Sequence, residues 1–183
     1  MRKLFFLLII AAATMSAAPA ASGDTYDDIR VTFYKAIEDA GTAERFYASL
    51  ASGKYSRDAE KDALLKAYLG AAETLLGKHY INPYSKYKHL KSGLEIIASA
   101  IKKDPSNLEI RFLRFSILHH LPGFLGYGPE RDEDMKVIYR ELLKKDYTEL
   151  PYDIQKGIAE FLIQSGRISA EQIKRLNGLL ARG

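Results

Sequence analysis

The chain contains no cysteine and no tryptophan, and it has only 6 prolines among its 183 residues. Without cysteine there is no disulfide framework, no thiolate metal site, no cysteine nucleophile and no cysteine to carry a lipid at an export junction. Basic and acidic residues are nearly balanced, 27 against 23, so the charge excess typical of a dedicated nucleic-acid-binding protein is missing. Hydrophobic residues make up 47% of the chain, which indicates a folded rather than a disordered protein.

The longest uninterrupted apolar run lies at the N-terminus, from Leu4 to Ala13, directly after Arg2 and Lys3. As a helix this run is about 15 Å long, roughly half the thickness of a bilayer's hydrocarbon core. The small residues Ala18-Pro19-Ala20 follow and match the requirement of signal peptidase for small side chains. These features predict a signal peptide, residues 1–20.

Cleavage near Ala20 would leave residues 21–183 as one mature domain, exported to the periplasm or secreted. The alternative is an uncleaved anchor, because the Ala-rich stretch extends the weakly apolar segment to Ala21. The mature portion has enough residues to bury a core without a metal or a disulfide.

Apolar residues recur every three or four positions through the mature portion, and no period-two run appears. The sequence therefore predicts an all-α domain of about eight helices. Short turns favour antiparallel neighbours, which predicts stacked helical hairpins. The expected helices are Asp24–Asp39 ended by Gly41, one capped by Thr42, one from Ser56 to Gly77, one from Asn82-Pro83 to Lys103, one capped by Ser106 or Asn107, one opened by Arg131, one from Pro151 to Gly166, and one opened by Ser169 and Gln172.

A tetratricopeptide-like pattern covers the middle of the chain. Gly93, Ile97, Ala100 and Pro105 follow the spacing of the second helix of such a repeat, and Leu69-Gly70 matches the Leu-Gly pair of the first. Small residues at Gly70 and one and two turns before it predict a close approach of the neighbouring helix. The sequence thus favours a TPR-like superhelix.

Three longer motifs occupy the segment between Ala63 and Leu143. They are Asn82-Pro83-Tyr84, the run from Leu108 to Ser116, and the turn from Pro122 to Tyr127. In these motifs the chain resembles a family of uncharacterised small exported TPR-like helical proteins of Bacteroidota. The resemblance implies a periplasmic location and helical repeats, and it implies no activity.

Arg111 and Arg114 lie three residues apart on an unusually apolar helix, so both guanidiniums leave the same side. A buried arginine must be paired, because an unpaired charge in the core costs several kcal/mol. The first interpretation is an internal salt bridge to Glu73, Glu95 or Glu109. The second is a clamp for a carboxylate or another anion.

Other polar clusters have simpler interpretations. His119 and His120 are adjacent, point about 100° apart on a helix and are expected to interact with free carbonyls at its end rather than bind a metal. Asp132, Glu133 and Asp134 open a helix, where acidic residues complement the helix dipole. No metal site and no cofactor is therefore expected.

The segment from Pro122 to Pro129 is rich in glycine and joins two helices. It lacks the preceding strand that a phosphate-binding loop requires. We expect its glycines to let Phe124 and Tyr127 fold back on the core, with an exposed recognition surface as the alternative.

Between Lys78 and Lys91 basic residues alternate with tyrosines, and no acidic residue is present. The favoured interpretation is a solvated helix face on which Tyr84 and Tyr87 pack inward. The alternative is contact with a polyanion or an anionic membrane surface through the lysines of this helix, which are Lys86, Lys88 and Lys91.

Taken together, these features favour a non-catalytic periplasmic binding or adaptor protein, because stacked hairpins present grooves that accept a protein or peptide. The expected binding residues are Tyr84, Tyr87, Arg111, Arg114, Phe124 and Tyr127. One alternative is a small-molecule or lipid pocket, with or without catalysis, in which the two arginines contact an acidic group. The other is an envelope component without a ligand. Nucleic acid is not an expected partner.

Overall fold

The computed structural model describes residues 25–55 and 62–181, which form eight α-helices and one 3-10 turn, without a strand in these two ranges. The all-α prediction and the expected number of helices are confirmed. The helices are α1 (Thr25–Glu38), α2 (Ala40–Ala51), α3 (Ala63–His79), α4 (Pro83–Lys103), α5 (Leu108–His119), α6 (Gly128–Leu142), α7 (Tyr152–Gln164) and α8 (Ala170–Leu180), with the 3-10 turn η1 (Gly123–Leu125) between α5 and α6.

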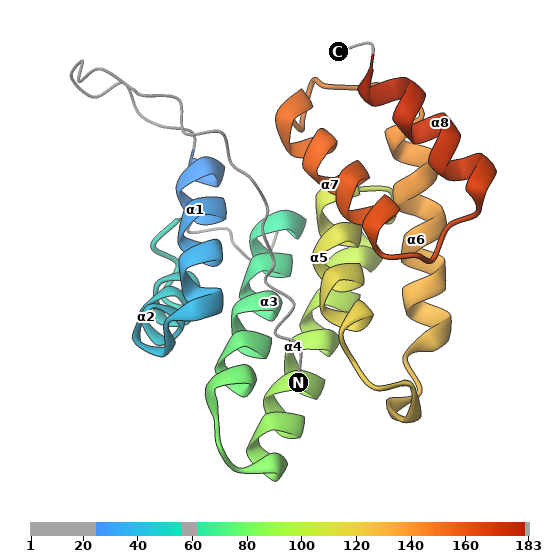
Figure 1. Ribbon diagram of the computed structural model, residues 1–183. Helices are drawn as coiled ribbons and strands as arrows, with labels where there is room; N and C mark the ends of the chain where they lie inside the picture. Colours follow the sequence, from blue (N-terminus) through green and yellow to red (C-terminus); the bar gives the residue numbers. More distant parts are fainter. Residues whose placement is uncertain (1–24, 56–61, 182–183) are drawn as a thin grey trace.

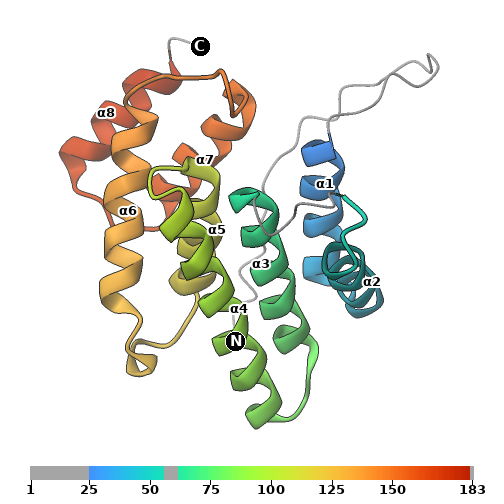
Figure 2. The same ribbon diagram turned by 180° about the vertical axis from the view of Figure 1, so that it is seen from behind.

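From α3 to α8 consecutive helices run in alternating directions and their hairpins stack side by side, whereas α2 is seen nearly end-on beside α1 (Figure 1). The α1–α2 pair lies on one side of α3, while α5 and α6 lie beyond the α3–α4 hairpin, and the view from behind agrees (Figure 2). Helices α7 and α8 close the far side over α6. This arrangement is compatible with the predicted stack of helical hairpins.

Several helices begin at the capping residues that the sequence predicts. The Asn82 side chain accepts a hydrogen bond from the backbone N–H of Tyr84 at 2.9 Å, and Pro83 occupies the first helical position. Asn107 caps α5 through the backbone N–H of Ile110 at 3.1 Å. The predicted capping box of Ser169 and Gln172 is present at the start of α8.

Three predicted helix starts differ from the structure. Asp39, not Thr42, caps α2, because its carboxylate accepts a 2.7 Å hydrogen bond from the Thr42 N–H, and Gly41 lies inside that helix. Helix α3 is capped by Asp62, and the predicted cap Ser56 lies outside the described residues. Helix α6 begins at Gly128 rather than at Arg131, since a proline at an early helical position favours the helix there.

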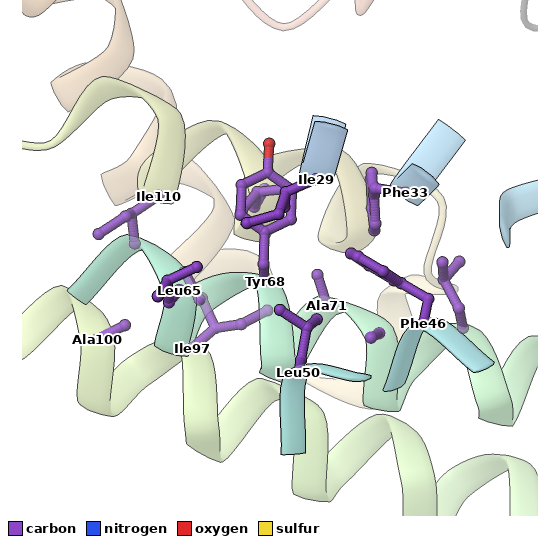
Figure 3. Packing of buried hydrophobic residues seen from close by; sticks show 14 of the residues in the cluster. Ile29, Phe33, Phe46, Leu50, Leu65, Tyr68, Ala71, Ile97, Ala100 and Ile110 are labelled. Carbon is purple, nitrogen blue, oxygen red and sulfur yellow. The ribbon is translucent and has the colours of Figure 1, made fainter. Parts of the chain in front are cut away.

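The buried apolar side chains form two clusters. The first joins α1, α2, α3 and α4, where Phe33, Phe46 and Tyr68 lie together (Figure 3). The second joins α6, α7 and α8 around Phe161 and Leu162. Helix α5 contributes to both clusters, through residues such as Ile110 in the first and Phe115 in the second, which explains its many apolar faces.

Helices α3 and α4 make their closest approach at two glycines. A Cβ atom on Gly70 would lie 2.6 Å from the backbone oxygen of Gly93, and one on Gly93 would lie against the backbone oxygen of Gly70 and 2.5 Å from Thr74 Cγ2. Both distances are too short for real carbon contacts, so neither position accepts a side chain without moving a helix. The close approach predicted from the small residues on α3 is confirmed at Gly70.

Candidate functional site

The two arginines of α5 are bound to acidic side chains of α6. Arg111 donates through Nη1 to Asp134 Oδ1 at 2.8 Å and to Glu133 Oε1 at 2.9 Å. Arg114 donates through Nε to Asp134 Oδ2 at 2.6 Å and through Nη2 to Oδ1 at 2.8 Å. Asp134 is 0% exposed, and Arg111 and Arg114 are 4% and 7% exposed. We call these three residues the α5–α6 ion cluster.

The acidic partner of Arg111 and Arg114 differs from the one that the sequence predicts. The expected partners were Glu73, Glu95 and Glu109, whereas the acidic residue between both guanidiniums is Asp134. The sequence placed Asp134 in the first turn of a helix that starts at Arg131, where the helix dipole explains an acidic residue. That interpretation is wrong, because α6 starts at Gly128 and only Glu130 is acidic in its first turn. Glu133, whose side chain is 58% exposed, contacts both arginines from the surface side of the cluster.

Electrostatics within the cluster follow from burial and hydrogen bonding. Burial alone would lower the pKa of Arg111, but hydrogen bonds to Asp134 and Glu133 raise that pKa above its ordinary value. Burial raises the pKa of the Asp134 carboxyl, and hydrogen bonds from Arg114 and Arg111 oppose that rise. Since Arg111 also donates to the backbone oxygen of Pro105 at 2.8 Å, most of its donors are already used inside the protein.

A second buried ion pair holds α1 against α5. Arg30 donates to both carboxylate oxygens of Glu109 at 2.8 Å, and the Tyr68 hydroxyl donates to Glu109 Oε1 at 2.6 Å. Burial, followed by the charge of Glu109 and the hydrogen bond to it, raises the pKa of Tyr68. Sequence analysis missed Arg30, although its place beside Ile29 on the buried stripe of α1 was an available signal.

A groove of about 310 Å³ lies where α4, α5 and the start of α6 meet. Its lining combines apolar and charged side chains. The lining residues are Lys91, Leu94, Glu95 and Ala98 from α4, Arg114 and Leu118 from α5, and Tyr127 and Glu130 near the start of α6. The groove thus takes its residues from three consecutive helices and the residue that precedes the third.

One polar atom in the groove wall has unused hydrogen-bonding capacity. Glu130 Oε2 is buried and has no hydrogen-bond partner among the residues that the structure describes. The neighbouring Tyr127 is half-buried, and burial, followed by the charges of Tyr87, Glu130 and Glu95, raises the pKa of its hydroxyl. A ligand that donates a hydrogen bond would satisfy this carboxylate oxygen.

The structure brings together some of the six predicted binding residues. Arg114 and Tyr127 line the groove, and Tyr87 lies near Tyr127. Arg111 lies inside the ion cluster and does not line the groove.

The predicted inward packing of several aromatic residues is wrong. Phe124 is 86% exposed on η1, and Gly126 ends this turn with the positive φ of 82° that glycine accepts. Tyr84 and Tyr87 are 75% and 48% exposed on α4. Their helix face points to solvent, since the opposite face, which carries Gly93, packs on α3.

The adjacent histidines lie at the end of α5. Arg167 donates through Nε to His119 Nδ1 at 2.9 Å, and the ring of His119 packs edge-on against Phe161. Burial lowers the pKa of His119 and of His120, so both favour the neutral form. Within the described ranges, no group of three His, Cys, Asp or Glu side chains could hold a metal ion.

Comparison of the chain with protein-family models, with curated proteins and with solved structures finds no match in any of the three. The resemblance to small exported proteins of Bacteroidota stays a prediction from its three sequence motifs. The candidate site therefore depends on the geometry of the groove between α4, α5 and α6.

Proposed function

We propose that this chain is an exported, non-catalytic binding protein that holds a peptide segment of a partner protein in the α4–α5–α6 groove. The observation that carries the proposal is the buried Glu130 Oε2, which lacks a hydrogen-bond partner in the described residues and lies in the groove wall. Buried polar atoms are normally satisfied, so an unsatisfied one in a groove favours a ligand that donates to it.

The residues that line the groove favour a ligand that inserts one apolar side chain and carries N–H donors on either side of it. Leu94, Ala98 and Leu118 supply apolar surface, while Glu130 supplies an acceptor. A peptide carries both kinds of group at fixed spacing, because every residue has a backbone N–H next to its side chain. The groove volume of about 310 Å³ is at the lower limit of small-molecule pockets and suits a side chain.

The alternative of a pocket in which Arg111 and Arg114 hold an acidic ligand has less support. Both guanidiniums are bound to Asp134, and Arg111 also binds Glu133 and Pro105. An acidic ligand would have to displace a carboxylate that is 0% exposed. A ligand of that kind would therefore compete with the protein's own buried ion pairs.

Peptide selection on the purified protein tests the groove. A displayed library of random peptides is expected to yield sequences with one apolar anchor, and each is then measured by calorimetry. Ala98→Arg should lower their affinity about tenfold or more, because the long side chain fills the groove. The matched control is Ala48→Arg, an exposed mid-helix position on α2 that should leave the affinity unchanged.

A second variant separates binding from stability. Glu130→Met removes the unsatisfied oxygen, so it should weaken peptide binding while the free energy of unfolding stays within about 1 kcal/mol of the wild type. Selected peptides that bind Ala98→Arg and Glu130→Met as tightly as the wild type would place the binding site elsewhere. A selection that enriches no peptide would also contradict the proposal.

Export is tested on the full chain expressed with its own N-terminal segment in a Gram-negative host. Residues 1–20 lie outside the described residues, and no helix in the described ranges is long and apolar enough to cross a membrane. The expected product accumulates in the periplasmic fraction, and its intact mass corresponds to a chain that begins at Ala21. Replacing Leu7 by Arg interrupts the apolar run and should retain the precursor in the cytoplasm. A folded protein that keeps Met1 would overturn cleavage.

A further inference from the structure

Exposed apolar side chains gather at one end of the molecule. Eight large apolar or aromatic side chains are exposed in the described residues, and five of them belong to the α3–α4 turn, the first turns of α4 and η1. These five are Tyr80 (47% exposed), Ile81 (95%), Tyr84 (75%), Tyr87 (48%) and Phe124 (86%). Their concentration at two neighbouring connections indicates a surface rather than scattered exposure.

The two connections lie at the same end of the helix stack. In both views the α3–α4 turn and the α5–α6 loop lie at the same end, and the α3–α4 turn reaches beyond the other connections there (Figures 1 and 2). We call residues 78–91 together with residues 122–126 the tip. The five apolar side chains of the tip are each at least 47% exposed, and none of them lines the α4–α5–α6 groove.

The tip is also basic. Lys86, Lys88 and Lys91 are exposed on the first turns of α4, and no acidic residue occurs between Glu73 and Glu95. Lys91 lies 4.0 Å from Glu95, whereas neither Lys86 nor Lys88 forms an ion pair with another described residue.

Acidic groups from neighbouring elements touch only the margin of the tip. Lys78 lies 3.7 Å from Glu38 at the end of α1, and His89 contacts Glu73 at 3.0 Å. The first contact joins the ends of α3 and α1, and the second lies on the side of α4 that faces α3. The outward side therefore combines free positive charge with exposed apolar side chains.

We propose that the tip docks on an anionic lipid surface. Ile81 and Phe124 would enter the boundary of the acyl chains, where burial recovers the free energy that their exposure to water costs. Tyrosine rings such as that of Tyr84 suit the headgroup layer, since one end is apolar and the other polar. Lys86 and Lys88 would lie among lipid phosphates, which attract lysines near the surface.

A lipid surface fits this end better than an acidic protein does. A protein partner would need pockets to receive the separate protruding side chains, while a lipid surface deforms around them. The proposal is independent of the groove, because Ile81, Phe124, Lys86 and Lys88 do not line it.

Vesicle flotation of the purified full-length expression product tests the proposal. The protein should float with vesicles that contain about one third phosphatidylglycerol in phosphatidylcholine, and flotation should fall with added salt. It should float far less with phosphatidylcholine alone. Absence of flotation with the anionic vesicles at low ionic strength would overturn the proposal.

Charge variants show whether the tip itself makes the contact. Lys86→Glu combined with Lys88→Glu should weaken vesicle binding about 30-fold or more, since each lysine near an anionic surface contributes about fivefold. The control is Lys156→Glu combined with Lys174→Glu, which makes the same change in net charge at exposed positions of α7 and α8. Equal weakening in both variants would contradict docking through the tip.

A single tryptophan measures insertion directly, because the natural chain has none. Ile81→Trp should show a blue-shifted emission and protection from iodide on adding anionic vesicles. Tyr147→Trp, at an exposed position between α6 and α7, should show neither change. An unshifted emission of Ile81→Trp on bound vesicles would exclude insertion of the tip, and a shift in both variants would show contact that is not specific to it.

Discussion

Asp134→Asn is expected to lower the free energy of unfolding by about 3–5 kcal/mol, because it leaves two buried guanidiniums without their shared negative charge. Asp134 is 0% exposed and accepts from both Arg111 and Arg114. Glu133 cannot replace it, since its side chain is 58% exposed and lies at the edge of the cluster. The measurement is urea unfolding followed by circular dichroism at constant pH.

The matched control is Asp132→Asn, two positions earlier on the same helix. Its carboxylate is 53% exposed and pairs with Arg131 at 3.0 Å, and a surface pair of this kind contributes about 0–1 kcal/mol. A triple variant, Arg111→Met, Arg114→Leu and Asp134→Leu, removes all three buried charges together. It should recover most of the lost stability, since well-packed apolar residues often replace a buried ion cluster without loss. An Asp134→Asn protein as stable as the Asp132→Asn control would contradict the assignment.

Gly93→Ala is expected to destabilise the fold by about 1–3 kcal/mol or more, although alanine is the better helix former. The new Cβ would lie against the backbone oxygen of Gly70, 2.5 Å from Thr74 Cγ2 and 2.9 Å from the Thr74 backbone nitrogen. Backbone atoms cannot turn aside as a flexible side chain can, so α3 and α4 would have to separate along part of the hairpin. The same urea titration measures the loss.

Gly178→Ala provides the control with the opposite sign. Gly178 lies inside α8, and a Cβ atom there would have no heavy atom within 4 Å. Alanine should therefore raise the free energy of unfolding by about 0.5–1 kcal/mol through its helix propensity alone. If Gly93→Ala and Gly178→Ala stabilised the protein equally, the close approach of α3 and α4 would be wrong.

The predicted site shows where sequence reasoning succeeds and where it stops. The i, i+3 spacing of Arg111 and Arg114 correctly indicated two guanidiniums on one side of an apolar helix. It did not identify Asp134, because that residue lies 20 positions beyond Arg114 and the expected helix start at Arg131 gave it a helix-dipole explanation that the structure does not support. The groove escaped prediction for a related reason, since its walls come from three helices.

Exposure was the property that sequence patterns predicted least well. Tyr84 and Phe124 were expected to pack inward, and both are largely exposed. An aromatic residue on an amphipathic helix suits either a core or an interface, because its hydrophobicity is the same in both. The choice depends on how the helix is rotated against its neighbour, which Gly70 and Gly93 determine for α3 and α4.

The sequence by itself determined the local structure of this protein. Helical periodicity, the caps at Asn82, Asn107 and Ser169 and the missing strand pattern depend on residues within a few positions of each other. Only the tertiary structure decided which carboxylate binds the α5 arginines, where the groove forms and which aromatic side chains remain in solvent. Those properties depend on the rotation and spacing of whole helices, and contacts between residues far apart in the chain set both.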